Sequence, residues 1–339
     1  FENGSLLGDL MQYVDAGTNC KLLLVGDPAQ LPPVHLDISP ALDADYLSRE
    51  FNKEVVECSL QEVVRQKHGS GILANATHLR QFLDESNLAD FQFDLDAGSD
   101  VRRMVEGNEI LEALEDSIQQ EGLEETVFIV RSNKRANSYN QQIRQRILFL
   151  EAELSVGDQL MVVKNNYFWL DPESAPGFIA NGDLVKVLRI IEHKEIYGFR
   201  FAKVEVDMVD YPEEKQFETM LLVDTLTMES PSLSYDQGNE LYQAVMEDYK
   251  HLTTKYKRFM AVKNNPYFNA LQVKFAYAVT CHKSQGGQWP VVFIDQGYIT
   301  EELLNKEYLR WLYTAITRAQ EKVYLINFHA SFFPEEQSD

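Results

Sequence analysis

Three polar stretches of the sequence, each directly after a hydrophobic run, carry residues that could do chemistry on a phosphate. The first reads Gly26-Asp27-Pro28-Ala29-Gln30-Leu31-Pro32-Pro33-Val34 and follows the apolar run Leu22–Val25. Open α/β sheets bind ligands at the carboxyl ends of their strands, where these polar groups would lie. The Gln30 amide can orient a water molecule or contact a terminal phosphate oxygen. A Gly-Asp-Pro turn alone is an ordinary strand-to-loop junction, so the prediction rests on the whole stretch.

The second stretch runs from Ala276 to Trp289 and again leads from a predicted strand into a polar turn that contains glycines. Backbone N–H groups of residues 284–287 could bind an anion. Thr280, His282 and Lys283 have side chains of the kind that contact DNA phosphates. Taken singly, His282 is more often a structural residue and Lys283 a surface lysine, so only their combination is informative.

The third stretch is Leu312–Ala319, which is predicted as the end of a helix and contains Arg318. A guanidinium group can reach a phosphate across the cleft between two domains. Arg65, which follows an expected strand ending near Leu60, is a fourth candidate of the same kind. An isolated arginine usually lies on a solvated surface, so neither residue is informative without the other stretches.

The elements that must position these stretches alternate between strands and helices up to about residue 150. This alternation predicts a parallel α/β sheet. After Gly157, short strands separated by turns predict a small antiparallel β-domain. The predicted helices are 5–16, 72–83, 110–118, 133–150, 306–317 and a tyrosine-rich helical insertion at 236–262. The predicted strands are 21–25, 54–60, 126–130, 159–164, 184–192, 198–209, 217–222, 274–280, 291–295 and 322–327.

Taken in order, the stretches around Gln30, Arg65, Thr280 and Arg318 resemble motifs III to VI of superfamily 1 DNA helicases, nearest to the RecD- and Dda-like branch, superfamily 1B. Three further pieces resemble the family's entry into a small β-barrel: Gly157-Asp158-Gln159-Leu160-Met161, Asn165-Asn166-Tyr167 and Asn181-Gly182-Asp183. The resemblance implies an α/β fold, with a RecA-like parallel-sheet motor domain, an inserted small antiparallel β-barrel and the C-terminal part of a first RecA-like domain. The expected boundaries are 1–62 for the remnant of the first domain, 63–164 with 273–339 for the second, and 165–272 for the barrel.

The resemblance also implies roles for individual residues. Gln30, Arg65 and Arg318 would contact the γ-phosphate as catalytic residues. The nucleotide-binding positions would be Gly26, Asp27, Gln285, Gly286 and Gln288, although the family usually has glutamate where this chain has Gln288. The DNA-binding positions would be Pro33, Asn166, Thr280, His282 and Lys283.

The phosphate-binding loop of the family does not occur in this sequence. No G-x-x-x-x-G-K-[ST] pattern is present, and no hydrophobic strand ending in Asp-Glu precedes Gly26. Both lie upstream of motif III in the family, so the resemblance implies the C-terminal portion of an ATP-dependent helicase. ATP and Mg²⁺ would be cofactors of the intact protein, a missing N-terminal motor segment would be the main partner, and this chain alone would lack ATPase activity.

Composition and charge limit the other classes of protein. The formal net charge is −22, but residues 84–125 hold 14 acids and two arginines, and residues 208–250 hold 10 acids and two lysines. The rest of the chain is nearly neutral and could carry a local cationic groove. No apolar run reaches the roughly 20 residues that span a bilayer, so no membrane association is expected. The three cysteines have no metal-ligand spacing and are predicted as buried, reduced thiols, which agrees with a cytoplasmic protein.

Two alternatives to a motor on DNA remain open. One is a stand-alone module with a degenerate motor fold that binds single-stranded nucleic acid or docks a protein. In that case Tyr167, Phe168 and Trp169 would stack on bases, unless they belong to the barrel core. The other is a motor on RNA, because no 2′-hydroxyl reader is identifiable. A nuclease or repair subunit on another chain, with a role in DNA repair or recombination, is compatible with either.

Overall fold

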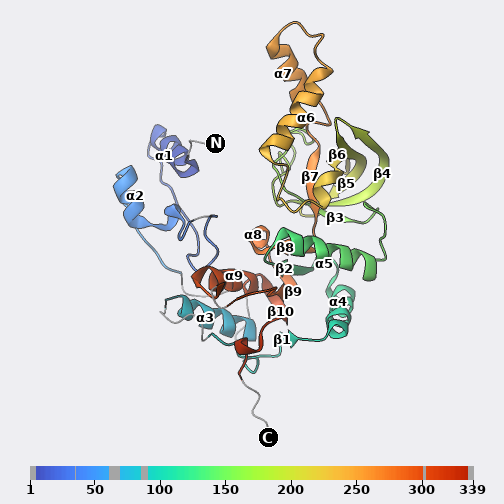
Figure 1. Cartoon of the computed structure of the whole chain (residues 1–339). Coiled ribbons are helices and arrows are strands. Elements are labelled where there is room, and N and C mark those ends of the chain that lie inside the picture. The colour runs from blue at the N-terminus through green and yellow to red at the C-terminus, as the bar shows by residue number, and fades with distance from the viewer. Residues whose placement is uncertain (1–4, 35, 61–68, 85–90, 301–302, 335–339) are drawn as a thin grey trace.

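A computed structural model describes residues 5–34, 36–60, 69–84, 91–300 and 303–334. The main domain is a five-stranded sheet in the order β1-β10-β9-β2-β8, and every neighbouring pair is parallel (Figure 1). Its strands are β1 (Val101–Met104), β2 (Thr126–Val130), β8 (Ala278–Thr280), β9 (Trp289–Asp295) and β10 (Ala319–Ile326). The predicted parallel α/β sheet is therefore confirmed.

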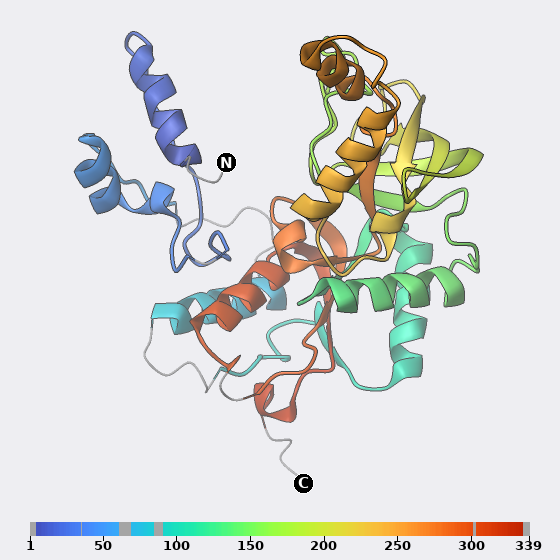
Figure 2. The same ribbon diagram turned by 45° about the horizontal axis from the view of Figure 1, so that its top comes forward.

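Helices cover both faces of this sheet, as its buried central strands β2 and β9 require. They are α3 (Gly71–Asp84), α4 (Gly107–Glu121), α5 (Asn133–Arg146), α8 (Cys281–Ser284) and α9 (Lys306–Ile316). Helices α3 and α9 pack together on one face, and α4 and α5 pack on the other (Figures 1 and 2). The sequence reasoning overlooked β1, because only four residues form it and two of them are arginines.

The second domain is a closed barrel of strands β3-β4-β5-β6-β7. Its strands are β3 (Gln159–Val162), β4 (Leu184–Ile196), β5 (Phe199–Met208), β6 (Phe217–Leu222) and β7 (Leu271–Phe275). The barrel begins before and ends after the predicted range 165–272, because β3 and β7 are needed to close it. One neighbouring pair, β6 with β7, is parallel, while the others are antiparallel as predicted. The helical insertion forms α6 (Tyr235–Glu247) and α7 (Lys255–Lys263) between these last two strands.

The predicted strand 274–280 is in fact two strands, and the break joins the two domains. Strand β7 ends in the barrel at Phe275, and β8 begins in the sheet at Ala278. Between them Tyr277 is buried and donates its hydroxyl proton to Asp158 Oδ1 at 3.1 Å. The same hydroxyl accepts the backbone N–H of Gln159 at 3.0 Å. A continuous apolar pattern cannot distinguish one long strand from two short ones that belong to different sheets.

The N-terminal part contains helices but no strand within residues 5–34 and 36–60. Its helices are α1 (Leu6–Ala16), the 3-10 turn η1 (Pro40–Leu42) and α2 (Ala44–Phe51). The predicted strands 21–25 and 54–60 are wrong for this structure, since neither segment pairs with a described strand. The side chains of Val25 and Leu60 are 81% and 88% exposed. An apolar run becomes a buried strand only where a neighbouring backbone pairs with it, and here no such neighbour is described.

Two further expectations can be compared with the structure. Cys281 is buried, and burial raises the pKa of its thiol to about 12, but Cys20 and Cys58 are exposed, contrary to the prediction of three buried thiols. Both lie near the unpaired segments 21–25 and 54–60, which explains their exposure. Among the described residues, no helix is both long and apolar enough to cross a bilayer.

A buried ion pair holds the barrel against the sheet domain. Arg144, on α5, donates from Nε and Nη2 to the two carboxylate oxygens of Asp158 at 2.8 and 2.9 Å. Both side chains are almost completely buried, and the guanidinium also stacks over the ring of Phe275 at 4.3 Å. Asp158 precedes β3, so this pair together with Tyr277 sets where the barrel leaves the sheet domain.

Replacing Arg144 with leucine should destabilise the fold strongly. The substitution leaves the Asp158 carboxylate buried without its cation, and breaking one side of a buried pair costs about 3–5 kcal/mol. Urea unfolding followed by circular dichroism measures this loss. Arg146→Leu, on the exposed side of the same helix, is the matched control and should change the free energy of unfolding by less than about 0.5 kcal/mol. Equal effects of the two substitutions would contradict the structural role of the pair.

Candidate functional site

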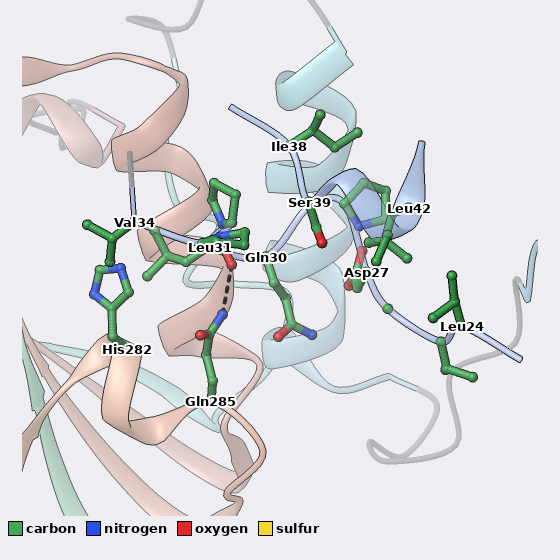
Figure 3. Close-up of a pocket in the computed structure, with 16 residues that line it drawn as sticks. Leu24, Asp27, Gln30, Leu31, Val34, Ile38, Ser39, Leu42, His282 and Gln285 are labelled. Atoms are coloured by element: carbon green, nitrogen blue, oxygen red, sulfur yellow. Dashed lines mark hydrogen bonds between the residues drawn. The ribbon is translucent and has the colours of Figure 1, made fainter. Parts of the chain in front are cut away.

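A crevice of about 470 Å³ lies between the loop 24–34 and the turn that follows β8. Its lining includes Gln30 from the loop and His282 and Gln285 from the turn, and Figure 3 shows these three side chains bordering the same space. Helix α8 begins directly after Thr280, at the carboxyl end of β8, as the strand-to-turn pattern predicted. The first and second polar stretches therefore meet at the edge of the sheet where α/β proteins bind ligands.

The backbone of Leu31 joins all three stretches. Its N–H donates to Thr314 Oγ1 on α9 at 2.9 Å, and its carbonyl accepts from Gln285 Nε2 at 2.9 Å. The Leu31 side chain is buried in the core between α3 and α9, together with Ala29. Thr314 is fully buried, so the bond from the Leu31 amide is shielded from water. The loop is thus held by one residue from each of the other two stretches.

Asp27 lines the crevice, and its carboxylate is held there by an ion pair. Arg80 Nη1, on α3, donates to Asp27 Oδ1 at 2.7 Å, and the Tyr313 hydroxyl donates to Oδ2 at 3.0 Å. Burial raises the pKa of Tyr313, and the negative charge of Asp27 adds to that shift. The pKa of Arg80 is raised because its bonds to Tyr313 and Asp27 outweigh its partial burial. Asp27 therefore positions the loop against the second domain.

Arg318 is close to the turn but not to the crevice. It is 3% exposed, and it donates from Nη1 to the carbonyl of Gly287 at 3.1 Å and from Nε to the carbonyl of Thr314 at 3.0 Å. These bonds hold the turn 285–288 against the end of α9. Arg318 is not among the residues that line the crevice, so the expected meeting of Gln30 and Arg318 there is not seen in this structure.

Two glycines give this turn its shape. Gly286 has φ +88°, a conformation that side chains disfavour. A Cβ on Gly287 would lie 2.3 Å from the ring of Trp289, so only glycine allows that close packing. Gln288 follows and is exposed. Gln285 and Gly286 are therefore positioned by the turn. Among the described residues no hydrogen bond holds the side chain of Gln288, so its expected nucleotide contact stays a prediction.

Of the predicted positions Gly26, Pro33 and Arg65, the structure describes the first two. Gly26 and Pro33 line the crevice with the rest of their loop. Arg65 lies outside the described residues, so its expected contact stays a prediction. The sequence did not predict that Arg80, Tyr313 and Thr314 belong to the site. Nothing in the sequence distinguishes a polar helix residue that faces this loop from one that faces solvent.

The predicted DNA-binding residues lie in three places, and two of the residues, Pro33 and His282, line the crevice. Thr280 and Lys283 line a small hollow beside the start of α5, together with Lys274. Burial lowers the pKa of Lys283, and it lowers the pKa of Lys274 to about 8. Asn166 is different, because its Nδ2 donates to the carbonyl of Asn269 at 2.8 Å and so ties two barrel loops together.

The aromatic residues after Asn166 are partly structural. Trp169 packs against two hydrophobic clusters, and its indole N–H donates to the carbonyl of Asn269 at 2.7 Å. Tyr167 is 69% exposed and stacks on Phe178, with ring centroids 4.8 Å apart. Of the three aromatic residues considered for base stacking, Trp169 therefore belongs to the core and Tyr167 is accessible.

A protein-family comparison covers the turn and α9. Residues 275–326 match the UvrD-like helicase C-terminal domain. This segment contains Thr280, Gln285 and Arg318, so the resemblance to superfamily 1 helicases is confirmed where two of its motifs lie. No curated protein sequence matches the chain.

Solved structures of Pif1 helicases are similar in fold. The Pif1 helicase from Candida albicans is 16% identical with a TM-score of 0.39, and the match covers 92% of this chain and 64% of that one. Pif1 from Bacteroides, in complex with ADP-AlF3 and ssDNA, is 15% identical with a TM-score of 0.45, covering 92% of this chain and 63% of that one. The chain thus spans less than two thirds of the length of these helicases.

The crevice does not contain the residues that would hold Mg²⁺ or a triphosphate. Among its lining residues there is no lysine or arginine, and its carboxylate, Asp27, is already bound by Arg80 and Tyr313. Gln30 and Gln285 have amides that fit contact with one phosphate oxygen or a water molecule. The described residues therefore fit one edge of a nucleotide site and not its metal or its phosphate cradle.

Replacing Thr314 with valine should loosen the loop 26–34. The substitution keeps the shape of the side chain but leaves the buried Leu31 amide without an acceptor, which costs about 1–3 kcal/mol. Hydrogen–deuterium exchange should show faster exchange over residues 29–34. Thr77→Val, which removes a similar helix hydroxyl on exposed α3, is the control and should leave that peptide unchanged. Unaltered exchange in Thr314→Val would refute the coupling.

Proposed function

We propose that this chain is the C-terminal part of an ATP-dependent DNA helicase that translocates on single-stranded DNA. The observation that carries the proposal is the junction at Leu31, where the Gln30 loop is bonded to both Gln285 and Thr314. A motor must transmit a change at the phosphate to the residues that grip the track. In this chain the two regions meet at one short helix, because Thr280 directly precedes α8 and Gln285 directly follows it.

The proposed coupling runs through rigid, buried parts. A shift of the Gln30 loop would be passed by the Leu31 carbonyl to Gln285, and Arg318 holds the next turn at Gly287. Because α8 connects this turn with Thr280, the turn and the proposed track can move together. ATP and Mg²⁺ would be held mainly by a motor segment outside this chain, and Gln30 would contact the terminal phosphate from the opposite side.

The exposed apolar side chains of the N-terminal part support a companion segment. Leu23, Val25, Val56 and Leu60 are each more than four-fifths exposed. Exposed apolar groups in neighbouring extended segments mark a surface that another polypeptide covers. This feature favours a motor part over the stand-alone binding module, which would have no need of such a surface. The RecD-like branch, a role in repair or recombination and a cytoplasmic location remain parts of the same proposal.

The chain alone should bind ATP too weakly to hydrolyse it. We expect no ATP turnover above background with saturating oligothymidylate. In the full-length parent protein, DNA-stimulated hydrolysis should be present, and Gln30→Ala should lower its kcat by about 10²-fold or more, in the range known for groups that contact developing charge. Gln288→Ala, on the exposed side of the turn, serves as the comparison and should have a smaller effect. DNA-stimulated ATP turnover by the isolated chain would refute the division of the site.

Lys283 should contribute one phosphate contact to binding of single-stranded DNA. Replacing it with glutamine should weaken binding to oligothymidylate and reduce the slope of log K against log salt by about 0.7, the value for one neutralised phosphate on a single strand. Fluorescence anisotropy at several salt concentrations measures both changes. Lys306→Gln, an exposed lysine at the start of α9, is the control and should leave the slope unchanged. Identical slopes for wild type and Lys283→Gln would remove Lys283 from the track.

A further inference from the structure

One long segment of this acidic protein contains no acidic residue at all. Residues 249–294 hold six lysines and one arginine but no aspartate or glutamate, in a chain whose net charge is −22. The segment covers α7, β7, β8 and α8. The proposed track uses its C-terminal part, at Lys274 and Lys283. Its N-terminal part, around α7, is not used by the site described above.

Helix α7 presents an exposed face that combines lysines and aromatic rings. At about 100° per residue, Lys255, Tyr256, Phe259 and Lys263 lie within an arc of roughly 100°. All four are exposed, and Tyr256 and Phe259 have exposed fractions of 71% and 49%. We call these four residues the α7 face. Val262, which lies about 20° outside this arc on the side of Lys255, is fully buried and anchors that edge of the helix.

The rings of Tyr256 and Phe259 are exposed although the insertion has a hydrophobic cluster that buries other aromatic residues. Below α7 a compact cluster buries Phe201, Leu241, Val245 and Val262, with Tyr249, Tyr267 and Phe268 packed against it. Arg258 Nε donates to the carbonyl of Leu252 at 2.8 Å, which fixes the start of the helix. The sequence therefore buries several aromatic residues of the insertion and leaves Tyr256 and Phe259 in solvent.

The nearest carboxylates of the insertion are already paired. At the end of α6, Glu247 forms an ion pair with Lys250, and Asp248 accepts a hydrogen bond from the Tyr197 hydroxyl. Neither residue belongs to the acid-free segment. The lysines of the α7 face have no ion pair with a carboxylate among the residues that the structure describes. Their charge is available to an anionic partner.

We infer that the α7 face is a second contact site for single-stranded nucleic acid, separate from the crevice and from the track at Thr280. Unpaired bases would stack on Tyr256 and Phe259, while Lys255 and Lys263 contact the neighbouring phosphates. Every base offers a ring face, so this contact would be insensitive to sequence. The inference rests on the proposed function for its ligand, although the site itself lies elsewhere.

Charge continuity favours nucleic acid over an acidic protein segment. Figure 1 shows α7 at the far end of the barrel and β7 running from the barrel toward β8 and α8. The acid-free segment follows this course, so a polyanion that leaves the track meets no carboxylate from that segment. Two solvent-exposed rings flanked by lysines also match the arrangement of stacking platforms, whereas an acidic peptide would need only the charges.

The experiment compares a short and a long oligothymidylate, of about 10 and about 30 nucleotides, since one binding module covers about 4–16 nucleotides. The double variant Tyr256→Ala with Phe259→Ala should bind the long strand at least about fivefold more weakly, as expected for the loss of one or two stacked bases. Its affinity for the short strand should be unchanged. Tyr13→Ala with Tyr235→Ala removes two equally exposed rings from other helices and is the control. Thermal unfolding confirms that both variants are folded.

A second variant tests the charges. Lys255→Gln with Lys263→Gln should lower the salt slope for the long strand by about 1.4, twice the single-contact value, and leave the short strand unaffected. Unchanged affinity and slope for the long strand in both α7 variants would overturn the inference. Binding of polyglutamate, but not of DNA, that depends on Lys255 and Lys263 would also overturn it, in favour of an acidic protein partner.

Failure of the proposed function has a different outcome. If Thr280 and Lys283 variants bind the short strand as wild type does, the track assignment fails. The inference on the α7 face still stands in that case, provided that the long strand depends on Tyr256 and Phe259. If the chain binds neither strand, both are wrong.

Discussion

The peptide group of Leu31 is the constraint on which the rest of the site depends. Its N–H and its carbonyl are bound by Thr314 and Gln285, which are 283 and 254 residues away in the sequence. In a sheet, these two groups would pair with neighbouring strands. Within the part of the chain that the structure describes, the loop 24–34 pairs with no strand, and two side chains bind these groups instead. Since an unpaired buried amide costs about 1–3 kcal/mol, the loop leaves this position at that cost unless both motifs move with it.

The ion pair of Asp27 with Arg80 has a complementary effect. Arg80 is partly exposed, so the pair contributes little to stability by itself. Its value is geometric, because Asp27 receives Arg80 from α3 and Tyr313 from α9 at the same time. A loop attached by surface-accessible charges and by one buried amide can be released and recaptured at modest cost. That property suits an element that must change position during a cycle, whereas the buried pair of Arg144 and Asp158 suits a permanent attachment.

Sequence reasoning located the elements that are determined locally and missed those that depend on a partner. The runs 126–130 and 217–222 became β2 and β6 with the predicted bounds, because each consists of consecutive strand-forming residues between clear turns. The run 21–25 has the same character but forms no strand, since pairing is decided by neighbours and not by the run itself. The meeting of Gln30 with His282 and Gln285 was predictable, because both stretches follow apolar runs of strand-forming residues, although only the second run forms a strand. The role of Arg80 and the buried orientation of Arg318 could not be predicted, because a side chain's partner across a domain contact leaves no pattern in its own helix.

The distribution of charge connects the two ends of the molecule. A net charge of −22 would repel a polyanion if it were spread evenly. The negative charge is instead concentrated in two blocks. Residues 84–125 include β1 and α4 of the sheet domain, and residues 208–250 include β6 of the barrel and α6. The acid-free segment 249–294, which begins at the end of the second acidic block, passes from α7 through β7 to α8, and so links the insertion to the edge of the crevice. Since screening limits electrostatic guidance to about 8–10 Å at physiological salt, only this local segregation, and not the net charge, determines where a nucleic acid strand can approach.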